Sequence, residues 1–282
     1  MLAAAAHFNF AGLIHPVAFI NSESLYPLIK EILRDWGIDR MEPDDARPPV
    51  ITIQKTEAGF ERRSKWLSKP AVFSDPVDAA CDLVVDLIHS YVAAHRGMLC
   101  LHCAAVKFNQ GLVVFPNTYR AGKSTLSLKL AESGERLFTD DVLPISNQGD
   151  LGLALGILPR IRLPLPEGMT PDFVDFVTNR AGPQNSRYLY AKLGLNEQAA
   201  LGTSAPINGV TILQREKNAK AALMKAKKSI VVKDMILRNF ARQNPGLEII
   251  DRVYSIVDNA RCHRLIYDNL DQAVSLLEEA FG

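Results

Sequence analysis

The chain reads Gly111-Leu-Val-Val-Phe-Pro-Asn-Thr-Tyr-Arg-Ala-Gly-Lys-Ser-Thr125 near its middle, and this order predicts a buried strand, a loop and a helix that opens near Gly122. At a helix N-terminus the first backbone N–H groups have no intrahelical partner and the helix dipole is positive, so an anion is stabilised there. Lys123 is predicted to reach phosphate oxygens, and the hydroxyl of Ser124 or Thr125 to complete the shell of a magnesium ion. The predicted nucleotide site comprises Asn117, Arg120, Ala121, Gly122, Lys123, Ser124 and Thr125.

The loop departs from the full phosphate-loop pattern. That pattern has a glycine five positions before Gly122, where this chain has Asn117. Glycine serves there because the backbone adopts a positive φ and approaches the ligand closely, and asparagine is the next most tolerant residue. We interpret Arg120 as a candidate for a phosphate contact that the missing glycines would make through their backbone.

Two adjacent carboxylates end the next predicted strand. Arg136-Leu-Phe-Thr-Asp-Asp141 follows the helix after Gly134, a residue suited to a helix C-terminal cap. A strand, loop, helix and strand of this length form a βαβ unit, which brings the carboxyl ends of its two strands to one edge. We therefore expect Asp140 or Asp141 to face the phosphate loop across a magnesium ion. The alternative is that the two acids only cap a strand end.

Four short segments in the middle of the chain form a combined pattern. They are Leu101-His-Cys-Ala-Ala-Val106, the polar turn Asn109-Gln-Gly111, the Gly-Lys-Ser-Thr helix start and Leu137-Phe-Thr-Asp-Asp141. This pattern resembles the core of the HPr kinase-like proteins, bacterial serine kinases whose catalytic domain is similar to phosphoenolpyruvate carboxykinase. The similarity is greatest to the shorter HPr-kinase-related proteins that are often found beside peptide-modification genes. It covers residues 98 to 145 well, the C-terminal tail from Cys262-His-Arg-Leu-Ile-Tyr267 loosely, and the first ninety residues hardly at all.

The resemblance implies an ATP-dependent kinase that phosphorylates a serine, or another hydroxyl, on a phosphocarrier-like protein or a precursor peptide. It implies ATP and Mg²⁺ as cofactors, Asp140 as the general base and Asp141 as a metal ligand. His102 would then orient the Asp140 carboxylate. Two other readings remain open: a nucleotide-binding sensor or scaffold without transfer activity, and a small-molecule kinase on the same fold. A homo-oligomer is one possibility, and GTP or pyrophosphate are alternative donors.

The chain also differs from the family downstream of the acids. The glycine-rich signature with a magnesium-binding glutamate is missing, and Leu158-Pro-Arg-Ile-Arg-Leu-Pro164 stands in the corresponding region. Arg160 and Arg162 lie in this segment and are candidate phosphate or substrate contacts, because guanidinium groups match phosphate oxygens. The alternative is that both are solvated charges at a strand edge.

Composition narrows the function classes. The chain has 282 residues, 48% of them apolar, which is enough for a sizeable core. A net charge of +1 argues against nucleic acid or an anionic membrane as partner. No apolar run is long enough to span a bilayer, and the start lacks a basic flank and a long apolar segment typical of a secretion signal. We expect a cytoplasmic protein.

The predicted fold is α/β with some α+β character. A small N-terminal α/β module, residues 1–96, is expected to precede a phosphate-loop-containing domain, residues 97–282, similar to the C-terminal domain of HPr kinase and to phosphoenolpyruvate carboxykinase. Ser74-Asp-Pro76 predicts the start of a long helix that ends near Ala94 and separates the two. Helices are also expected over 24–36, 231–242 and 247–259, strands over 8–20, 48–55, 98–108, 142–145, 151–155 and 210–214, and a loop or lid over 179–186.

The cysteines raise the question of a metal site, because Cys100-Leu-His-Cys103 has the spacing of a zinc-binding pair. If residues 98 to 108 form one strand, Cys100 and Cys103 point to opposite faces, which opposes joint ligation. Together with Cys81 and Cys262 we interpret them as reduced, buried thiols.

Overall fold

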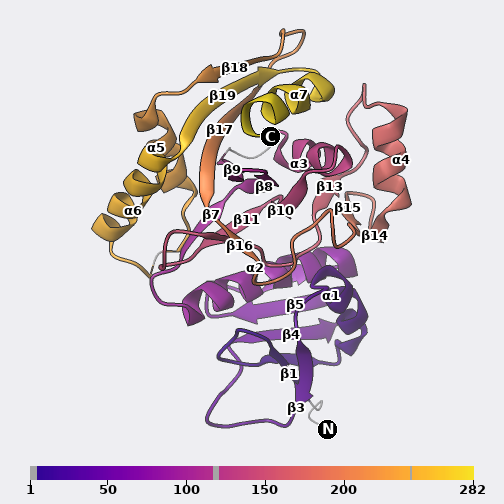
Figure 1. The fold of residues 1–282 in the computed structure, drawn as a ribbon. Coiled ribbons are helices and arrows are strands. Elements are labelled where there is room, and N and C mark those ends of the chain that lie inside the picture. Colours follow the sequence, from indigo (N-terminus) through magenta and orange to yellow (C-terminus); the bar gives the residue numbers. More distant parts are fainter. Residues whose placement is uncertain (1–4, 117–120, 242) are drawn as a thin grey trace.

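A computed structural model describes residues 5–116, 121–241 and 243–282. The predicted loop residues Asn117 and Arg120 lie outside these ranges. The described residues form a mixed α/β structure with four sheets and helices α1 to α7 (Figure 1). The expected α/β class is thereby confirmed.

The first sheet is built entirely from residues before the long helix. Its order is β3-β1-β2-β4-β5-β6, with β2 and β4 parallel and the other neighbours antiparallel. The predicted strand over 8–20 is in fact an antiparallel pair, and the predicted helix over 24–36 is shorter. The elements are β1 (Ala5–Phe10), β2 (Val17–Ile20), a 3-10 turn (Glu23–Leu25), α1 (Tyr26–Ile32), β3 (Ile38–Met41), β4 (Ile51–Thr56), β5 (Gly59–Ser64) and β6 (Ala71–Phe73).

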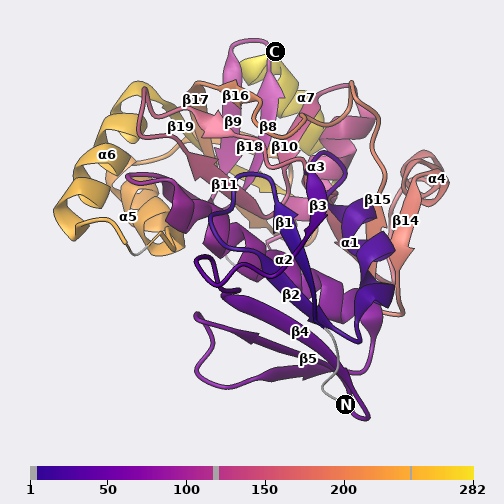
Figure 2. The ribbon, with the colours of Figure 1, turned by 90° about the horizontal axis from the view of Figure 1, so that it is seen from below.

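The long helix α2 (Pro76–Ala94) begins and ends where the sequence predicts. Asp75 caps it, because its side chain accepts a hydrogen bond from the backbone N–H of Asp78, and Pro76 occupies the first turn. Leu83 and Leu87, one helical turn apart, are fully buried. In Figure 1 α2 lies between the first sheet and the remainder of the fold, and seen from below it runs across the molecule behind strands of that sheet (Figure 2).

The central sheet carries the predicted strand–loop–helix. Its order is β10-β8-β9-β17-β19-β18, and β9, β17 and β19 are parallel. Both β9 and β10 run antiparallel to β8 between them, so they run in the same direction and end at the same edge. The predicted βαβ arrangement is confirmed, with β8 inserted. The strands are β8 (Ala104–Phe108), β9 (Gly111–Phe115), β10 (Arg136–Thr139), β17 (Ile207–Arg215), β18 (Ala222–Lys225) and β19 (Arg261–Tyr267).

Helices cover both faces of this sheet (Figure 1). On one face, α3 (Lys123–Glu132) and α7 (Leu270–Phe281) pack over a core that includes Phe115, Leu126 and Leu277. On the other face lie α5 (Lys228–Arg238) and α6 (Gly246–Asn259). The helix predicted over 231–242 corresponds to α5, which starts and ends earlier.

Two small sheets complete the fold, and they differ from the strand predicted over 98–108 and the loop predicted over 179–186. Residues 98–108 form β7 (Leu99–His102) and β8, which belong to different sheets, so the chain changes sheet at Cys103. The predicted loop over 179–186 contains β14 (Ala181–Gln184), which pairs with β15 (Tyr188–Ala191). The small sheets are β16-β12-β11-β7 and β13-β15-β14, with β11 (Val142–Ile145), β12 (Gly152–Leu153), β13 (Arg160–Arg162) and β16 (Ser204–Ala205), and α4 (Pro171–Asn179) precedes β14.

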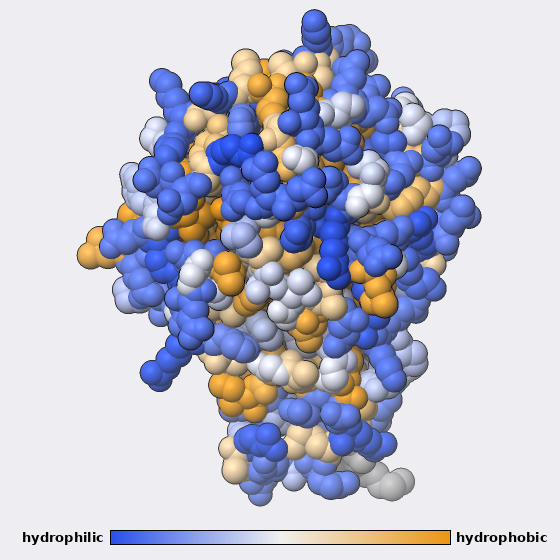
Figure 3. Space-filling model, viewed as in Figure 1, coloured by the Kyte–Doolittle hydropathy of each residue, from blue (hydrophilic) through white to orange (hydrophobic). Residues whose placement is uncertain are grey.

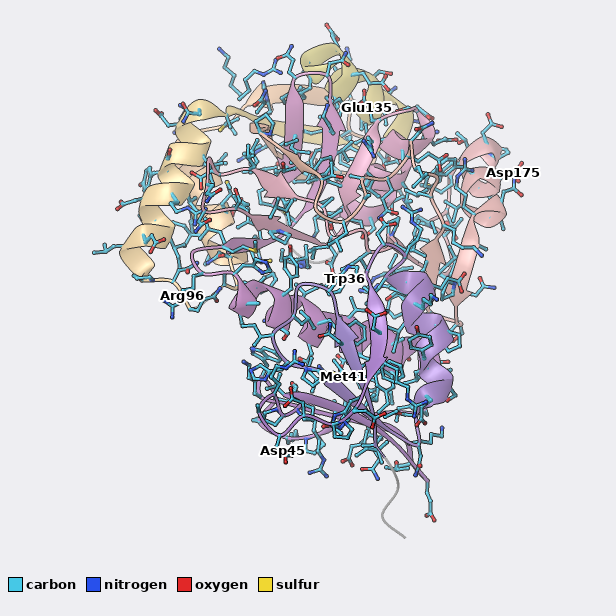
Figure 4. The ribbon with its side chains drawn as sticks, turned by 60° about the horizontal axis from the view of Figure 1, so that its bottom comes forward. Trp36, Met41, Asp45, Arg96, Glu135 and Asp175 are labelled. Carbon is cyan, nitrogen blue, oxygen red and sulfur yellow. The ribbon has the colours of Figure 1, made fainter. Side chains whose placement is uncertain are left out.

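One hydrophobic cluster joins the N-terminal sheet to the later part of the chain. The cluster around α2 includes Leu155, Leu158 and Tyr190 from the later part of the chain. Trp36 lies at this junction (Figure 4), and its indole N–H donates a 2.7 Å hydrogen bond to the carbonyl of Leu155. The two parts are therefore joined by burial and by hydrogen bonding.

The surface is predominantly polar. In Figure 3 hydrophilic side chains cover most of the visible face, and hydrophobic ones form small separate groups. Within the described ranges, none of the helices has both the length and the apolar character needed to cross a bilayer.

Candidate active site

The helix predicted to hold phosphate begins at Lys123, with Gly122 as its N-cap. Gly122 adopts a left-handed conformation with φ of 86°. A Cβ at this position would lie 2.7 Å from the hydroxyl of Tyr267, which is fully buried. Both the backbone and the packing therefore require glycine at the start of the helix. Lys123, the next residue, is only 7% exposed.

The first turn of α3 contacts the end of β10. The Ser124 hydroxyl donates a 2.8 Å hydrogen bond to Asp140 Oδ2. The same oxygen accepts a 3.2 Å hydrogen bond from the backbone N–H of Arg160. The sheet register explains the approach, because Phe115 at the end of β9 pairs with Ala104, and Thr139 at the end of β10 pairs with Ala105. The expected proximity of helix start and carboxylates is confirmed.

The histidine pairs with the second acid instead of the first. His102 Nδ1 lies 3.1 Å from Asp141 Oδ1, so the expectation that it orients Asp140 is wrong. The reason is the pairing of β7 with β11, which sets His102 opposite Val142, directly after Asp141. The two acids lie in the bend between β10 and β11. Asp140 is buried there, with 8% of the residue exposed, whereas 48% of the Asp141 side chain is exposed.

The site concentrates charge in a poorly solvated space. Burial, and then the charge of Asp141, raise the pKa of Asp140 to about 6. Burial also lowers the pKa of Lys123, against the opposing effect of the Asp141 charge. The pKa of His102 is lowered by burial as well, although Asp141 acts in the other direction. A bound cation beside Asp140 and a polyanion beside Lys123 would both relieve these penalties.

A cavity of about 450 Å³ opens on the other side of the two acids. Asp140, Asp141 and His102 contribute to its wall. The apolar part of the wall comes mainly from α2, from the segment before β13 and from the residues after α5: Cys81, Val84, Val85, Ile88, Ile157, Leu158 and Phe240. Asp82, His89, Thr139, Val142, Arg160 and Tyr190 also line the cavity. The N-terminal module thus forms one side of the space that faces the carboxylates.

The sequence patterns described above did not predict this apolar wall. Val84 and Ile88 belong to the apolar stripe by which α2 packs against the core, and both are buried, but they also line the cavity. Val85, beside them, is 44% exposed. An apolar residue next to a stripe that is already complete is the signal that would have indicated a second packing surface.

The two arginines of β13 differ. Arg160 lines the cavity, lies 4.6 Å from the Tyr188 ring as a cation–π pair, and its guanidinium contacts the Cys81 thiol. Arg162 is exposed, 5.8 Å from the same ring, and within the described ranges it does not contribute to the cavity wall. Of the two predicted substrate contacts, the structure places Arg160 at the acids.

Among the residues that the structure describes, no group of three His, Cys, Asp or Glu side chains is placed to hold a metal. Cys100 and Cys103 are fully buried in two different core clusters, as expected for reduced thiols.

A magnesium site needs fewer protein ligands than such a three-residue group, since Mg²⁺ takes one or two carboxylates and completes its shell with phosphate oxygens and water. The Ser124 hydroxyl and the Asp140 carboxylate are oxygen ligands of this kind, so the residues fit Mg²⁺.

A scan against models of known protein families gave no match, and a search of curated proteins gave none.

Proposed function

We propose that the protein is an ATP-dependent kinase with an HPr kinase-like catalytic domain, and that it phosphorylates a serine, or another hydroxyl, on a small protein or peptide. The observation that carries this proposal is the hydrogen bond from Ser124 to Asp140. It joins a phosphate-type helix start to a buried carboxylate, and the adjacent Asp141 faces a cavity that can admit a second substrate. Phosphoryl transfer needs these three parts in one place.

The donor phosphates would bind at the start of α3. Backbone N–H groups of Gly122 to Thr125 would donate to phosphate oxygens, and Lys123 would neutralise the charge on the β and γ phosphates. Ser124 and Asp140 would hold Mg²⁺, which supplies charge neutralisation between these phosphates when bound. This exchanges the two acids relative to the sequence-based expectation, because Asp140 is the acid that contacts Ser124.

The acceptor would enter through the cavity. Its hydroxyl would donate to Asp141, whose carboxylate is held by His102 at 3.1 Å. As the hydroxyl oxygen bonds to the γ-phosphorus, its proton passes to the Asp141 carboxylate. The bond between the γ-phosphorus and the β–γ bridging oxygen breaks, and ADP leaves with the electron pair. Arg160 lines the same cavity and is the candidate to hold the transferred phosphoryl group.

A sensor or scaffold that binds nucleotide without transfer is the second candidate. The presence of Asn117 and Arg120 in place of loop glycines favours it. Both candidates require binding of Mg-ATP, and only the kinase requires an acceptor and a base.

Incubation with γ-labelled ATP, Mg²⁺ and a library of serine-containing peptides separates the two. The kinase predicts label on peptide that is lost in Asp141→Asn while Mg-ATP still raises the melting temperature. Thermal stabilisation by Mg-ATP without label on any peptide supports the sensor. If Mg-ATP neither stabilises the protein nor labels a peptide, both proposals are wrong.

A further inference from the structure

A second cavity, of about 360 Å³, lies beside α3, and Lys129 of that helix contributes to its wall. It is formed where α4 and α7 begin and where β17 turns toward β18. Its wall includes Lys129, Phe173, Arg215, Asn218 and Asp268. The volume falls within the ~300–1,000 Å³ that small-molecule pockets occupy. None of the predicted site residues that the structure describes lines it.

The sheet topology connects this cavity to the phosphate site. Since β9, β17 and β19 are parallel, their carboxyl ends lie at one edge, where open α/β sheets bind ligands. Asp140 lies on one side of β9, beyond β8, whereas Arg215 and Tyr267 end the two strands on the other side. The ends of β17 and β19 therefore lie at the same edge as Asp140, and a phosphate chain whose terminal group faces Asp140 has room to extend along this edge toward them.

Tyr267 lies between the two places. Its ring belongs to the core under α3, and its hydroxyl is aimed at Gly122. The residue is fully buried, and within the described part of the chain its hydroxyl has no hydrogen-bond partner. An unpaired buried hydroxyl is unfavourable unless a ligand supplies an acceptor. Burial raises the pKa of Tyr267 to about 12, so the group remains a donor at neutral pH. The next residue, Asp268, is already part of the cavity wall.

The basic side chains of the cavity wall are already paired with carboxylates. Lys129 Nζ lies 2.6 Å from Glu132 and 2.8 Å from Asp271, and Arg215 lies 3.8 Å from Asp268. The Asp268 carboxylate is oriented by a 2.8 Å hydrogen bond from the backbone N–H of Asn218. Such a wall suits an uncharged group with several hydrogen-bonding atoms better than a further anion.

We infer that the phosphoryl donor is a nucleoside triphosphate, that its nucleoside occupies this second cavity, and that the Tyr267 hydroxyl donates a hydrogen bond to its phosphate chain. The inference rests on the proposed function, because it takes the terminal phosphate to face Asp140. It excludes inorganic pyrophosphate as the preferred donor. Asp268 is placed to accept from a ribose hydroxyl or a base amine, and Phe173 to cover an apolar face of the nucleoside.

The test compares Mg-ATP, Mg-GTP and Mg-tripolyphosphate as ligands of the full chain by isothermal titration calorimetry. Tripolyphosphate carries the phosphate chain without a nucleoside. We expect at least one nucleotide to bind 10-fold or more tightly than tripolyphosphate. Ala219→Trp, which fills the cavity, should remove this difference and leave tripolyphosphate binding unchanged. Ala46→Trp, on the exposed surface of the N-terminal module, is the matched control.

Tyr267→Phe tests the hydroxyl and does not depend on the folding of the tryptophan variant. It should weaken ATP and tripolyphosphate binding alike, by about 5- to 10-fold, without lowering the melting temperature of the ligand-free protein. Tyr254→Phe, at an exposed position, is the control.

Equal affinity of wild type for the nucleotides and tripolyphosphate overturns the nucleoside site, as does unchanged ATP binding in Ala219→Trp. Unchanged binding in Tyr267→Phe overturns the role of the hydroxyl. If the proposed function itself is wrong, neither ATP nor tripolyphosphate binds to the wild-type protein, and this result differs from both outcomes above.

Discussion

Ser124 Oγ lies 2.8 Å from Asp140 Oδ2, so the first turn of α3 and the end of β10 are hydrogen-bonded to one another. Ser124 lies in the first turn of the helix of a βαβ unit, Asp140 directly follows its second strand, and the carboxylate is turned away from solvent. A buried carboxylate beside a helix N-terminus is a place where a cation and a polyanion can bind together. The predictions below depend on this arrangement.

Lys123→Ala should abolish the stabilisation of the protein by Mg-ATP. A ligand present at about 100 times its Kd stabilises the folded state by ~2.7 kcal/mol, and this gain is lost when the phosphates lose their cation. The measurement is the ATP-induced shift in melting temperature, taken relative to the ligand-free form of each variant. Lys217→Ala, at an exposed position, is the control and should shift as wild type does. Equal shifts in wild type and Lys123→Ala would refute the phosphate site.

Asp140→Asn should stabilise the ligand-free protein at pH 8. The folded-state pKa of Asp140 is raised to about 6, against ~3.9 in the unfolded chain. The folded state therefore binds the proton more tightly, and the stability contributed by this group is present below pH ~4 and lost as the pH rises through 6. Ionisation of Asp140 costs on the order of 3 kcal/mol at pH 8, which the neutral amide avoids.

Urea unfolding of both proteins at pH 4 and pH 8 measures this effect. The difference in the free energy of unfolding should be small at pH 4 and favour Asp140→Asn at pH 8. Asp45→Asn, at an exposed position, should show no such pH dependence. If the free energies of unfolding of the two proteins differ by the same amount at both pH values, burial does not shift the pKa of Asp140.

Asp141→Asn should lower kcat by roughly 10²- to 10⁴-fold, the usual contribution of a positioned base, while ATP binding is retained. Asp140→Asn should instead raise the magnesium concentration needed for ATP binding, because Asp140 contacts Ser124. Kinetics at varied Mg²⁺ concentration distinguish the two acids. If Asp141→Asn shows the altered magnesium dependence and Asp140→Asn does not, the roles implied by the sequence resemblance are the correct ones.

Gly122→Ala should be more damaging than Gly134→Ala. Both glycines have positive φ, 86° and 108°, so both substitutions introduce backbone strain of about 1–2 kcal/mol. A Cβ at 122 would in addition lie 2.7 Å from the Tyr267 hydroxyl, whereas nothing lies within 4 Å at 134. Chemical unfolding should show an extra loss of ~1–3 kcal/mol at 122, the usual cost of overpacking. Tyr267→Phe should recover part of that extra loss. Similar losses at the two positions would contradict the close packing.

Much of the local structure could be predicted because its causes are local. The cap at Asp75 and the apolar spacing after it determine α2, and the apolar run before Gly122 determines β9. The position of the acids also followed from the sequence, since a strand after a short helix returns to the same edge of the sheet. In contrast, β14 contains Gly182 and Pro183 and was predicted as a loop, because only its pairing with β15 makes it a strand.

The partner of His102 could not be predicted in the same way. It depends on the change of sheet at Cys103, which the residue pattern over 98–108 does not predict, and on the register of β7 against β11. The cavity beside the acids likewise requires α2 (Pro76–Ala94) to lie close to residues far along the chain, such as Leu158 and Phe240. These contacts are long-range, and the amino-acid pattern around each residue carries no record of them.

The sequence by itself determined where a phosphate-type helix start, a lysine and two carboxylates occur, and that the chain forms an α/β fold. These features depend on hydrophobic periodicity, capping and the geometry of a single crossover, which act over short distances along the chain. The tertiary structure alone decided that Asp140 contacts Ser124 and Asp141 contacts His102, and that Tyr267 points its hydroxyl at Gly122. Such pairs are selected by sheet register and by burial among distant strands, because only the packed molecule removes water from one acid and leaves its neighbour exposed.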